Sequence, residues 1–192
     1  MMLLIAGLVL FLGVHSVRIV ADDWRTAQIA RMGELPWKAV YSVVSLAGLA
    51  LLVYGYGASR ADPVILWQPP VWTKHLASLL TLAAFVLLAA AYVPRNHLKA
   101  KLHHPMVLGI KVWALAHLLA NDRIGDMLLF GGFLVWAALS FRAARARDRR
   151  SGRTYPAGTV GGTVATVLAG GVAWAAFAMA GHAWLIGVRP FG

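Results

Sequence analysis

The chain has 192 residues, of which 60% are hydrophobic and 13% charged, and a soluble chain of this length could not hide so much apolar surface in one core. The net charge of +11 would suggest nucleic-acid binding in a soluble protein, but the basic residues lie between apolar runs, where they fit loops beside anionic lipid headgroups. The absence of cysteine excludes disulfides, thiolate metal sites and cysteine nucleophiles. We therefore expect an integral membrane protein with one domain over residues 1–192, in contact with membrane lipid and with no nucleic acid.

Six apolar stretches approach the ~20 residues that a helix needs to cross ~30 Å of hydrocarbon. In chain order they lie at about Met1–Ile19, Ala39–Gly57, Val71–Val93, Met106–Ala120, Ile124–Phe141 and Val160–Val188. The fourth is short as drawn and reaches full length only if His103 and His104 lie inside it. A tight polar turn, Asn-Asp-Arg-Ile-Gly-Asp, joins the fourth stretch to the fifth and suits a helical hairpin. The sequence predicts an all-α fold, a polytopic membrane bundle of about six transmembrane helices.

Lysines and arginines are distributed unevenly between the two sides that a six-span topology defines. The loops after the first, third and fifth stretches carry thirteen, namely Arg18, Arg25, Arg31, Lys38, Arg95, Lys99, Lys101, Arg142, Arg145, Arg147, Arg149, Arg150 and Arg153. The other side carries four, namely Arg60, Lys74, Arg123 and Arg189. Because basic loops favour the cytoplasm, this difference predicts that both termini lie outside it.

Histidines are the residues of this chain that could carry chemistry, because an ionisable side chain inside a span is costly and is a functional candidate. His15 lies near the end of the first stretch, and His75 opens the third. His103 and His104 open the fourth, and His117 lies well inside it. Each one alone can also be a hydrogen-bonded structural histidine. Several directed into one bundle favour a shared site.

A b-type haem suits this set of side chains. Neutral imidazoles from two helices commonly hold such a haem in a membrane bundle, each supplying one axial nitrogen. The spans contain no cysteine and no acidic cluster, so haem fits better than zinc or a di-iron centre. The chain has no c-type attachment motif, so the haem would be bound non-covalently.

The segment from His103 to His117 holds the densest group of candidates. At ~100° per residue, one broad helical face carries His103, Trp113, His117 and Asn121, while His104 and Lys111 share another. Spacing alone does not select the ligand pair. Depth along the predicted spans favours His15 with His104, or His75 with His117.

Two patterns are specific enough to compare with known families. The first is the series His15-Ser16, Arg25, Gly33-Glu34, Trp37-Lys38 and Tyr41-Ser42. The second is the stretch HHPMVLGIKVWALAHLLAND, with His-Pro, a glycine four residues after the proline, Trp-x-x-x-His and a following Asn. Together they resemble the NnrU family over nearly the whole chain.

The resemblance implies a multi-pass protein of the bacterial inner membrane, associated with nitrite and nitric oxide reduction during denitrification. The NnrU family is also similar to the plant 15-cis-zeta-carotene isomerase, a membrane protein that binds haem b. Its ligands are the histidine of the first-span His-Ser motif and the histidine that ends Trp-x-x-x-His, which correspond here to His15 and His117. The isomerase has a cysteine directly after that tryptophan, where this chain has Ala114. The resemblance therefore implies a redox or isomerase-like role on a hydrophobic small molecule, without a thiolate ligand.

Two alternatives belong to other classes of protein. The His-Pro entrance to the fourth stretch also resembles the Arg-His-Pro motif of membrane methyltransferases that use S-adenosylmethionine, although His103 replaces the arginine and no glutamate follows Phe141. A non-catalytic membrane factor for assembly or sensing, with purely structural histidines, would be colourless when purified.

Overall fold

The structure, a computed structural model of the chain, describes residues 1–191. Within these residues the chain is helical, and the only strand-like pairings are isolated bridges. In chain order the helices are α1 (Met2–Val20), α2 (Asp22–Met32), α3 (Glu34–Ser59), α4 (Val71–Tyr92), α5 (His97–Leu102), α6 (Pro105–Ala120), α7 (Ile124–Ser151), α8 (Val160–Ala176), the π-helical turn η1 (Phe177–Gly181) and α9 (His182–Ile186).

Five helical segments are long and apolar enough to cross a membrane, namely Met2–Val20, Glu34–Ser59, Val71–Tyr92, Ile124–Ser151 and Val160–Ile186. The last joins α8, η1 and α9 into one continuous helical segment. The remaining predicted span, the fourth, corresponds to α6, which is apolar but has only 16 residues, as its short stretch indicated. Many large apolar side chains along the spans are exposed, as lipid-facing residues should be. The predicted all-α membrane bundle is confirmed.

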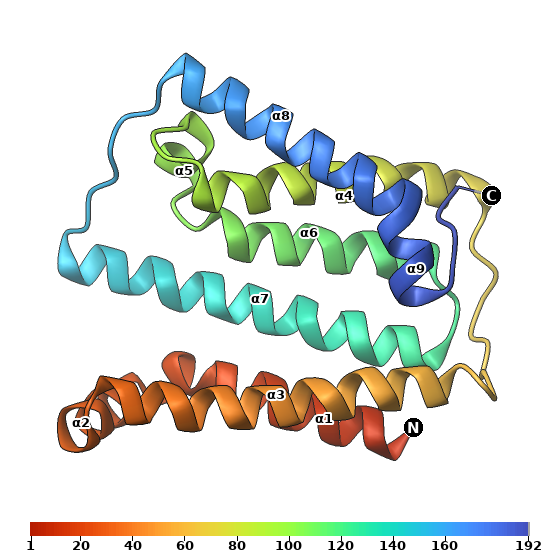
Figure 1. The fold of residues 1–192 in the computed structure, drawn as a ribbon, viewed down its shortest axis with the longest axis horizontal. Coiled ribbons are helices and arrows are strands. Elements are labelled where there is room, and N and C mark those ends of the chain that lie inside the picture. Colours follow the sequence, from red (N-terminus) through yellow and green to blue (C-terminus); the bar gives the residue numbers. More distant parts are fainter. Residues whose placement is uncertain (192) are drawn as a thin grey trace. The chain divides into compact units, whose positions relative to one another are not determined.

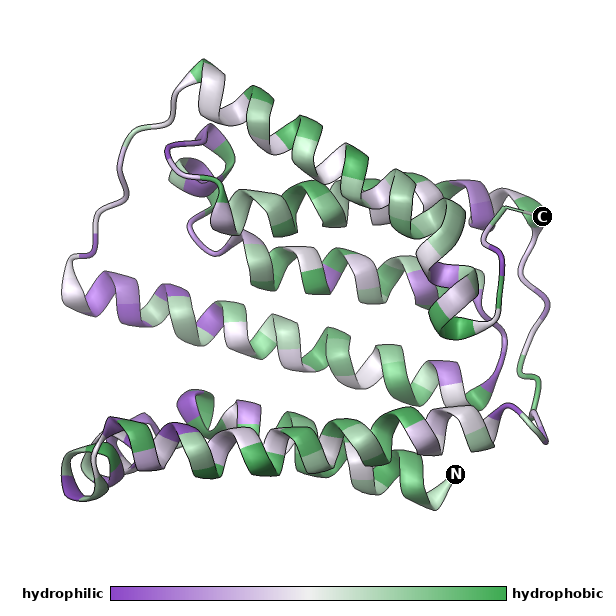
Figure 2. Ribbon diagram, viewed as in Figure 1, coloured by the Kyte–Doolittle hydropathy of each residue, from purple (hydrophilic) through white to green (hydrophobic). Residues whose placement is uncertain are grey.

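Polar residues gather where the spans end. Figure 2 shows hydrophobic residues along the long helices and hydrophilic ones in α2, around α5 and at the C-terminal end of α7. Neither α2 nor α5 was predicted, because neither contains an apolar run. The α7 helix also continues ten residues beyond Phe141, through the arginine-rich segment that was expected to be a loop.

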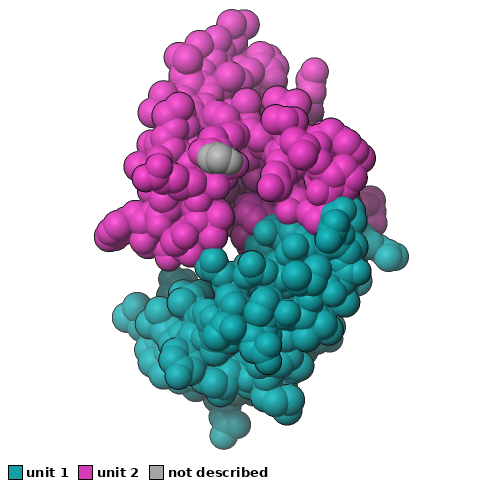
Figure 3. Space-filling model, turned by 90° about the vertical axis from the view of Figure 1, so that its right-hand side faces the viewer, with its two compact units in different colours: residues 1–68, 121–143 teal, residues 69–120, 144–192 magenta. Residues whose placement is uncertain are grey.

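The chain divides into two compact units, coloured separately in Figure 3. Unit 1 comprises Met1–Gln68 and Asn121–Ala143, and unit 2 comprises Pro69–Ala120 and Ala144–Gly192. The α7 helix contributes residues to both. The expectation of a single domain over residues 1–192 stays a prediction.

In unit 1, α1 and α3 lie side by side at very close range (Figure 1). Glycines permit this approach, because a Cβ atom on Gly7 would collide with the backbone of Leu52 and one on Gly55 with the backbone of Leu4. Small residues at such contacts let helix backbones approach within the apolar membrane interior. The α1–α3 pair is therefore the rigid base on which the first-span histidine is held.

In unit 2, α4 contacts both α6 and α8 (Figure 1). A Cβ atom on Gly109 of α6 would lie 3.0 Å from the Ala84 carbonyl oxygen of α4. The buried Asn96 connects the end of α4 to α5, because its side-chain amide donates to the Ala90 and Val93 carbonyls while its oxygen accepts from the Lys99 amide. These contacts fix the segment that leads into His103 and His104.

Candidate functional site

His15 lies in unit 1, five residues before the end of α1, with its side chain half-buried among aromatic rings. Its ring centroid lies 4.3 Å from that of Phe11, 5.3 Å from that of Tyr41 and 6.2 Å from that of Trp136. The Tyr41 and Trp136 rings both meet it edge-on. Three helices, α1, α3 and α7, thus supply the surroundings of one imidazole.

Close packing explains why these rings meet. Gly48 of α3 lies against the backbone of Phe11, where an added Cβ would come within 2.7 Å of the Phe11 nitrogen. A Cβ added to Gly132 of α7 would lie 3.4 Å from the Leu12 side chain. Trp136 follows Gly132 by one turn on the same helix face. Small residues on two helices therefore bring the aromatic rings to His15.

One polar atom beside His15 is buried without a hydrogen-bond partner among the described residues. It is the indole Nε1 of Trp136. A buried donor left unpaired costs about 1–3 kcal/mol, so native proteins seldom keep one without a reason. The Trp136 N–H, beside His15, is available to a bound molecule.

The His15 imidazole is fixed by a hydrogen bond to its own helix. Its Nδ1 lies 2.7 Å from the Phe11 carbonyl oxygen, four residues earlier. A carbonyl can only accept, so Nδ1 must donate, and in the neutral ring the lone pair is then on Nε2. Metal-bound histidines are typically held in this way, with one ring N–H donated to a backbone carbonyl or a carboxylate.

His117 lies in unit 2, three residues before the end of α6, and repeats this local geometry. Its Nδ1 lies 3.0 Å from the carbonyl oxygen of Trp113, again four residues earlier. The Trp113 and His117 ring centroids are 5.1 Å apart. Both histidines that the resemblance selected therefore have an aromatic residue one turn earlier, whose carbonyl orients the imidazole and whose ring packs against it.

The other two histidine candidates lie in different surroundings. His75 is exposed on the second turn of α4. The Nε2 atom of His104 lies 2.8 Å from a carboxylate oxygen of Asp148, near the end of α7. His104 thus uses Nε2 for a charged protein partner.

Around His104, unit 2 contains a cluster of polar groups that sequence reasoning did not find. We call it the Asp148 cluster, formed by His103, His104, Arg145, Asp148 and Tyr155. Asp148 is 8% exposed, and its Oδ2 accepts a hydrogen bond from the Tyr155 hydroxyl at 2.9 Å as well as from His104. Burial and the neighbouring Asp148 carboxylate raise the pKa of the Tyr155 phenol, which therefore stays protonated and donates at neutral pH.

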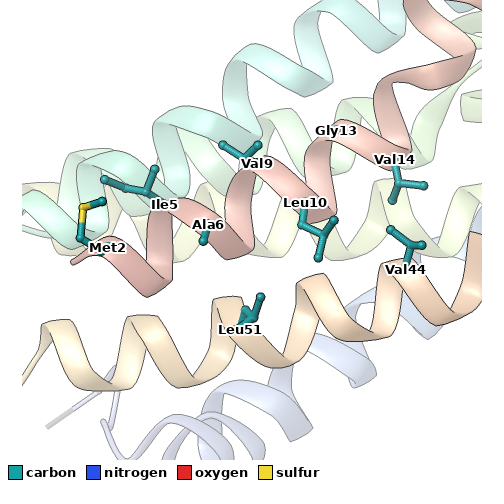
Figure 4. Close-up of a pocket in the computed structure, with 9 residues that line it drawn as sticks. All are labelled: Met2, Ile5, Ala6, Val9, Leu10, Gly13, Val14, Val44 and Leu51. Carbon is teal, nitrogen blue, oxygen red and sulfur yellow. The ribbon is translucent and has the colours of Figure 1, made fainter.

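A groove between α1 and α3 offers apolar surface but no polar group to orient a substrate. It has a volume of about 680 Å³ and is lined by α1 from Met2 to Val14 and by Val44 and Leu51 of α3 (Figure 4). By helical periodicity the α1 residues that line it lie on the side of the helix opposite His15. Lipid chains suit such a groove better than a haem held by His15.

The fold and these sites define a multi-pass helical membrane protein with oriented histidines on its spans. The family model described as NnrU protein matches residues 3–190, and the chain belongs to the NnrU family. No match was found among curated proteins or among solved structures. Family membership, predicted from the His-Ser and Trp-x-x-x-His patterns, is confirmed.

Haem ligation is a separate prediction that these comparisons do not address. In residues 1–191 no group of three or more His, Asp or Glu side chains is arranged to hold a metal ion. A haem needs only one or two protein ligands, because the porphyrin supplies four nitrogens to the iron. The proposal below therefore depends on individual histidines.

Proposed function

We propose that this NnrU-family protein binds haem b, and that His15 and His117 are the residues that would hold its iron. We propose further that it lies in the bacterial inner membrane with both termini in the periplasm. Its role is redox or isomerase-like, acts on a hydrophobic small molecule and is linked to nitrite and nitric oxide metabolism in denitrification. The family resemblance supports the metabolic role, and the excess of basic residues on one side supports the orientation.

The observation that carries the haem proposal is the hydrogen bond that the two histidines share. In each, Nδ1 donates to the carbonyl oxygen of the residue four positions earlier, Phe11 for His15 and Trp113 for His117. This bond fixes the ring orientation, puts the lone pair on Nε2 and raises its basicity, all of which favour binding to iron.

Aromatic residues around His15 support the proposal. Phe11, Tyr41 and Trp136 offer ring contacts of the kind that suit an apolar macrocycle. The Trp136 indole N–H has no partner in the described part of the chain and can donate to a haem propionate or to a small molecule bound beside the haem. When bound, the haem would supply a one-electron redox centre.

His15 and His117 are better suited to iron than the alternatives that depth along the spans favoured. His75 is exposed, and no hydrogen bond that orients its ring is seen in the described part of the chain. His104 already donates or shares a proton through Nε2 with the buried Asp148 carboxylate. The contribution of this chain is thus to orient two imidazoles through backbone carbonyls and to surround them with aromatic side chains.

The test is the absorption spectrum of the full chain purified in detergent, oxidised and reduced, after expression with sufficient haem. We expect a Soret band that is lost or shifted in His15→Ala and in His117→Ala. His182→Ala is the matched control, because the Nδ1 of His182 also donates to a carbonyl, that of Val188 at 2.7 Å, outside the proposed ligand set. Its spectrum should equal that of the wild type.

A protein that stays colourless after reconstitution with haem would overturn the proposal and favour the assembly or sensing factor. Saturable binding of S-adenosylmethionine by the colourless protein, measured by calorimetry, would instead favour the methyltransferase alternative. A Soret band that survives both ligand substitutions would reject the ligand pair while leaving haem binding in place.

A further inference from the structure

We propose that two members of the Asp148 cluster, Arg145 and His103, bind a phosphate-bearing anion together with Arg153. The site lies at the arginine-rich end of α7. All of these residues belong to unit 2, and the proposal is independent of haem. The ligand class is an anion that carries a phosphate group, supplied either by a phospholipid headgroup or by a soluble phosphate.

The Asp148 cluster holds one carboxylate beside two arginines, its own Arg145 and the neighbouring Arg153. Its only carboxylate, Asp148, accepts hydrogen bonds through Oδ2 from His104 and from Tyr155. Neither Arg145 nor Arg153 forms a salt bridge with a carboxylate among the residues that the structure describes. The Asp148 carboxylate thus accepts from the His104 imidazole and the Tyr155 phenol, and neither guanidinium is paired with it at salt-bridge distance, although the charge of Arg153 acts on it through space.

Each of the two guanidinium groups contacts an aromatic ring of the cluster. Arg145 hydrogen-bonds to Nδ1 of His103, and because a guanidinium can only donate, Nδ1 accepts and Nε2 of His103 carries the ring proton. Arg153 lies over the Tyr155 ring, with its central carbon 5.3 Å from the ring centroid. The His103 and Tyr155 rings stack at 4.3 Å. Stacking and hydrogen bonding therefore hold both arginines and one imidazole N–H close together.

The backbone at His103 has an unusual conformation. Its φ of +69° lies in a region that residues other than glycine rarely adopt. Such strain persists only where the surroundings hold it, and it is concentrated at functional sites. Here it turns the chain sharply between α5 and α6 and directs the His103 ring toward Arg145 and Tyr155.

A phosphate is the anion that these donors fit best. Planar guanidinium groups donate two parallel hydrogen bonds to phosphate oxygens, and the imidazole N–H adds a third donor. The cluster also lies where the apolar part of α7 gives way to arginines, at the level at which a lipid headgroup would lie beside a membrane-spanning helix. The headgroup is therefore one natural source and soluble phosphate is the other.

The experiment titrates the detergent-purified full chain with three probes, and calorimetry measures the dissociation constants. The probes are dihexanoyl phosphatidylglycerol, dihexanoyl phosphatidylcholine and sodium phosphate. We expect Arg145→Gln and Arg153→Gln to weaken binding of the phosphate-bearing anion about tenfold each, the usual loss for one charge-assisted contact. The double variant Arg149→Gln/Arg150→Gln, which removes two exposed charges of the same run, should bind within about twofold of the wild type.

Binding of phosphatidylglycerol without binding of free phosphate would support the lipid source. Comparable binding of free phosphate would support the soluble source, and both outcomes uphold the site. Equal losses in the Arg149/Arg150 control, or no saturable binding of either anion, would overturn it. Should Arg145→Gln fail to fold, judged by helicity and elution volume, Arg153→Gln carries the test alone, because Arg153 is exposed and lies beyond the end of α7. Arg153→Lys should then bind more tightly than Arg153→Gln.

Discussion

The Nε2 atom of His104 lies 2.8 Å from the Oδ2 atom of Asp148, although 44 positions separate them in the sequence. This bond connects the start of α6 to the end of α7 within unit 2. Tyr155 donates to the same oxygen from the segment that follows α7. A single buried carboxylate thus holds three chain segments together.

We predict that Asp148→Ala destabilises the protein by about 2 kcal/mol, because His104 and Tyr155 lose their shared acceptor in a poorly solvated position. The measurement is the free energy of unfolding in mixed micelles, or the shift in Tm. Asp23→Ala is the control, since Asp23 is exposed and should change stability by less than about 0.5 kcal/mol. Equal stability of the two variants would show that the carboxylate is not a structural connection.

The glycine contacts of unit 1 give a second prediction. Gly55→Val should separate α1 from α3 or prevent folding, because its Cβ would occupy the backbone of Leu4 rather than the flexible end of a side chain. Gly13→Val is the matched control, since a Cβ there meets nothing within 4 Å. The readout is the yield of monodisperse protein and its helicity. A Gly55→Val protein with the yield and Tm of the control would contradict the close approach of these helices.

Much of the fold could be predicted because membrane spans are determined by local composition. The first predicted stretch, Met1–Ile19, corresponds to α1 (Met2–Val20), and the third, Val71–Val93, corresponds to α4 (Val71–Tyr92). Hydrocarbon thickness fixes the length and the apolar run supplies it, so no tertiary information is needed. The short helices α2 and α5 lack this signal, and polar helices are stabilised mainly by contacts that one sequence does not reveal.

The candidate site could be predicted only in part. The hydrogen bonds of His15 and His117 to carbonyls four residues earlier follow from helix geometry and could have been expected. The Asp148 cluster could not, because it depends on a contact between distant segments. One signal was present, since Asp148 is the single acidic residue in a run of arginines from Arg142 to Arg153. An isolated carboxylate in such a run needs a partner, and the partner proved to be His104.

The orientation of the chain gives a third prediction, and the absence of native cysteine makes it simple to test. A membrane-impermeant maleimide added to intact spheroplasts should label Ala61→Cys, in the exposed segment after α3, and should label Ser151→Cys only after lysis. The reason is that the arginine-rich end of α7 is expected in the cytoplasm and the segment after α3 on the other side. The reverse labelling pattern would contradict the prediction that both termini lie in the periplasm.

The fourth prediction concerns Trp136, whose buried indole N–H has no partner among residues 1–191. Trp136→Phe removes that donor and keeps an aromatic ring near His15, so the apo protein should be as stable as the wild type, within about 1 kcal/mol, or slightly more stable. If the N–H serves a bound haem or a molecule beside it, the same variant should bind haem about tenfold more weakly or shift the Soret band. Trp72→Phe is the control, because Trp72 is exposed at the start of α4 and should leave both properties unchanged. A Trp136→Phe protein with unaltered haem affinity and spectrum would show that the indole N–H has no part in the site.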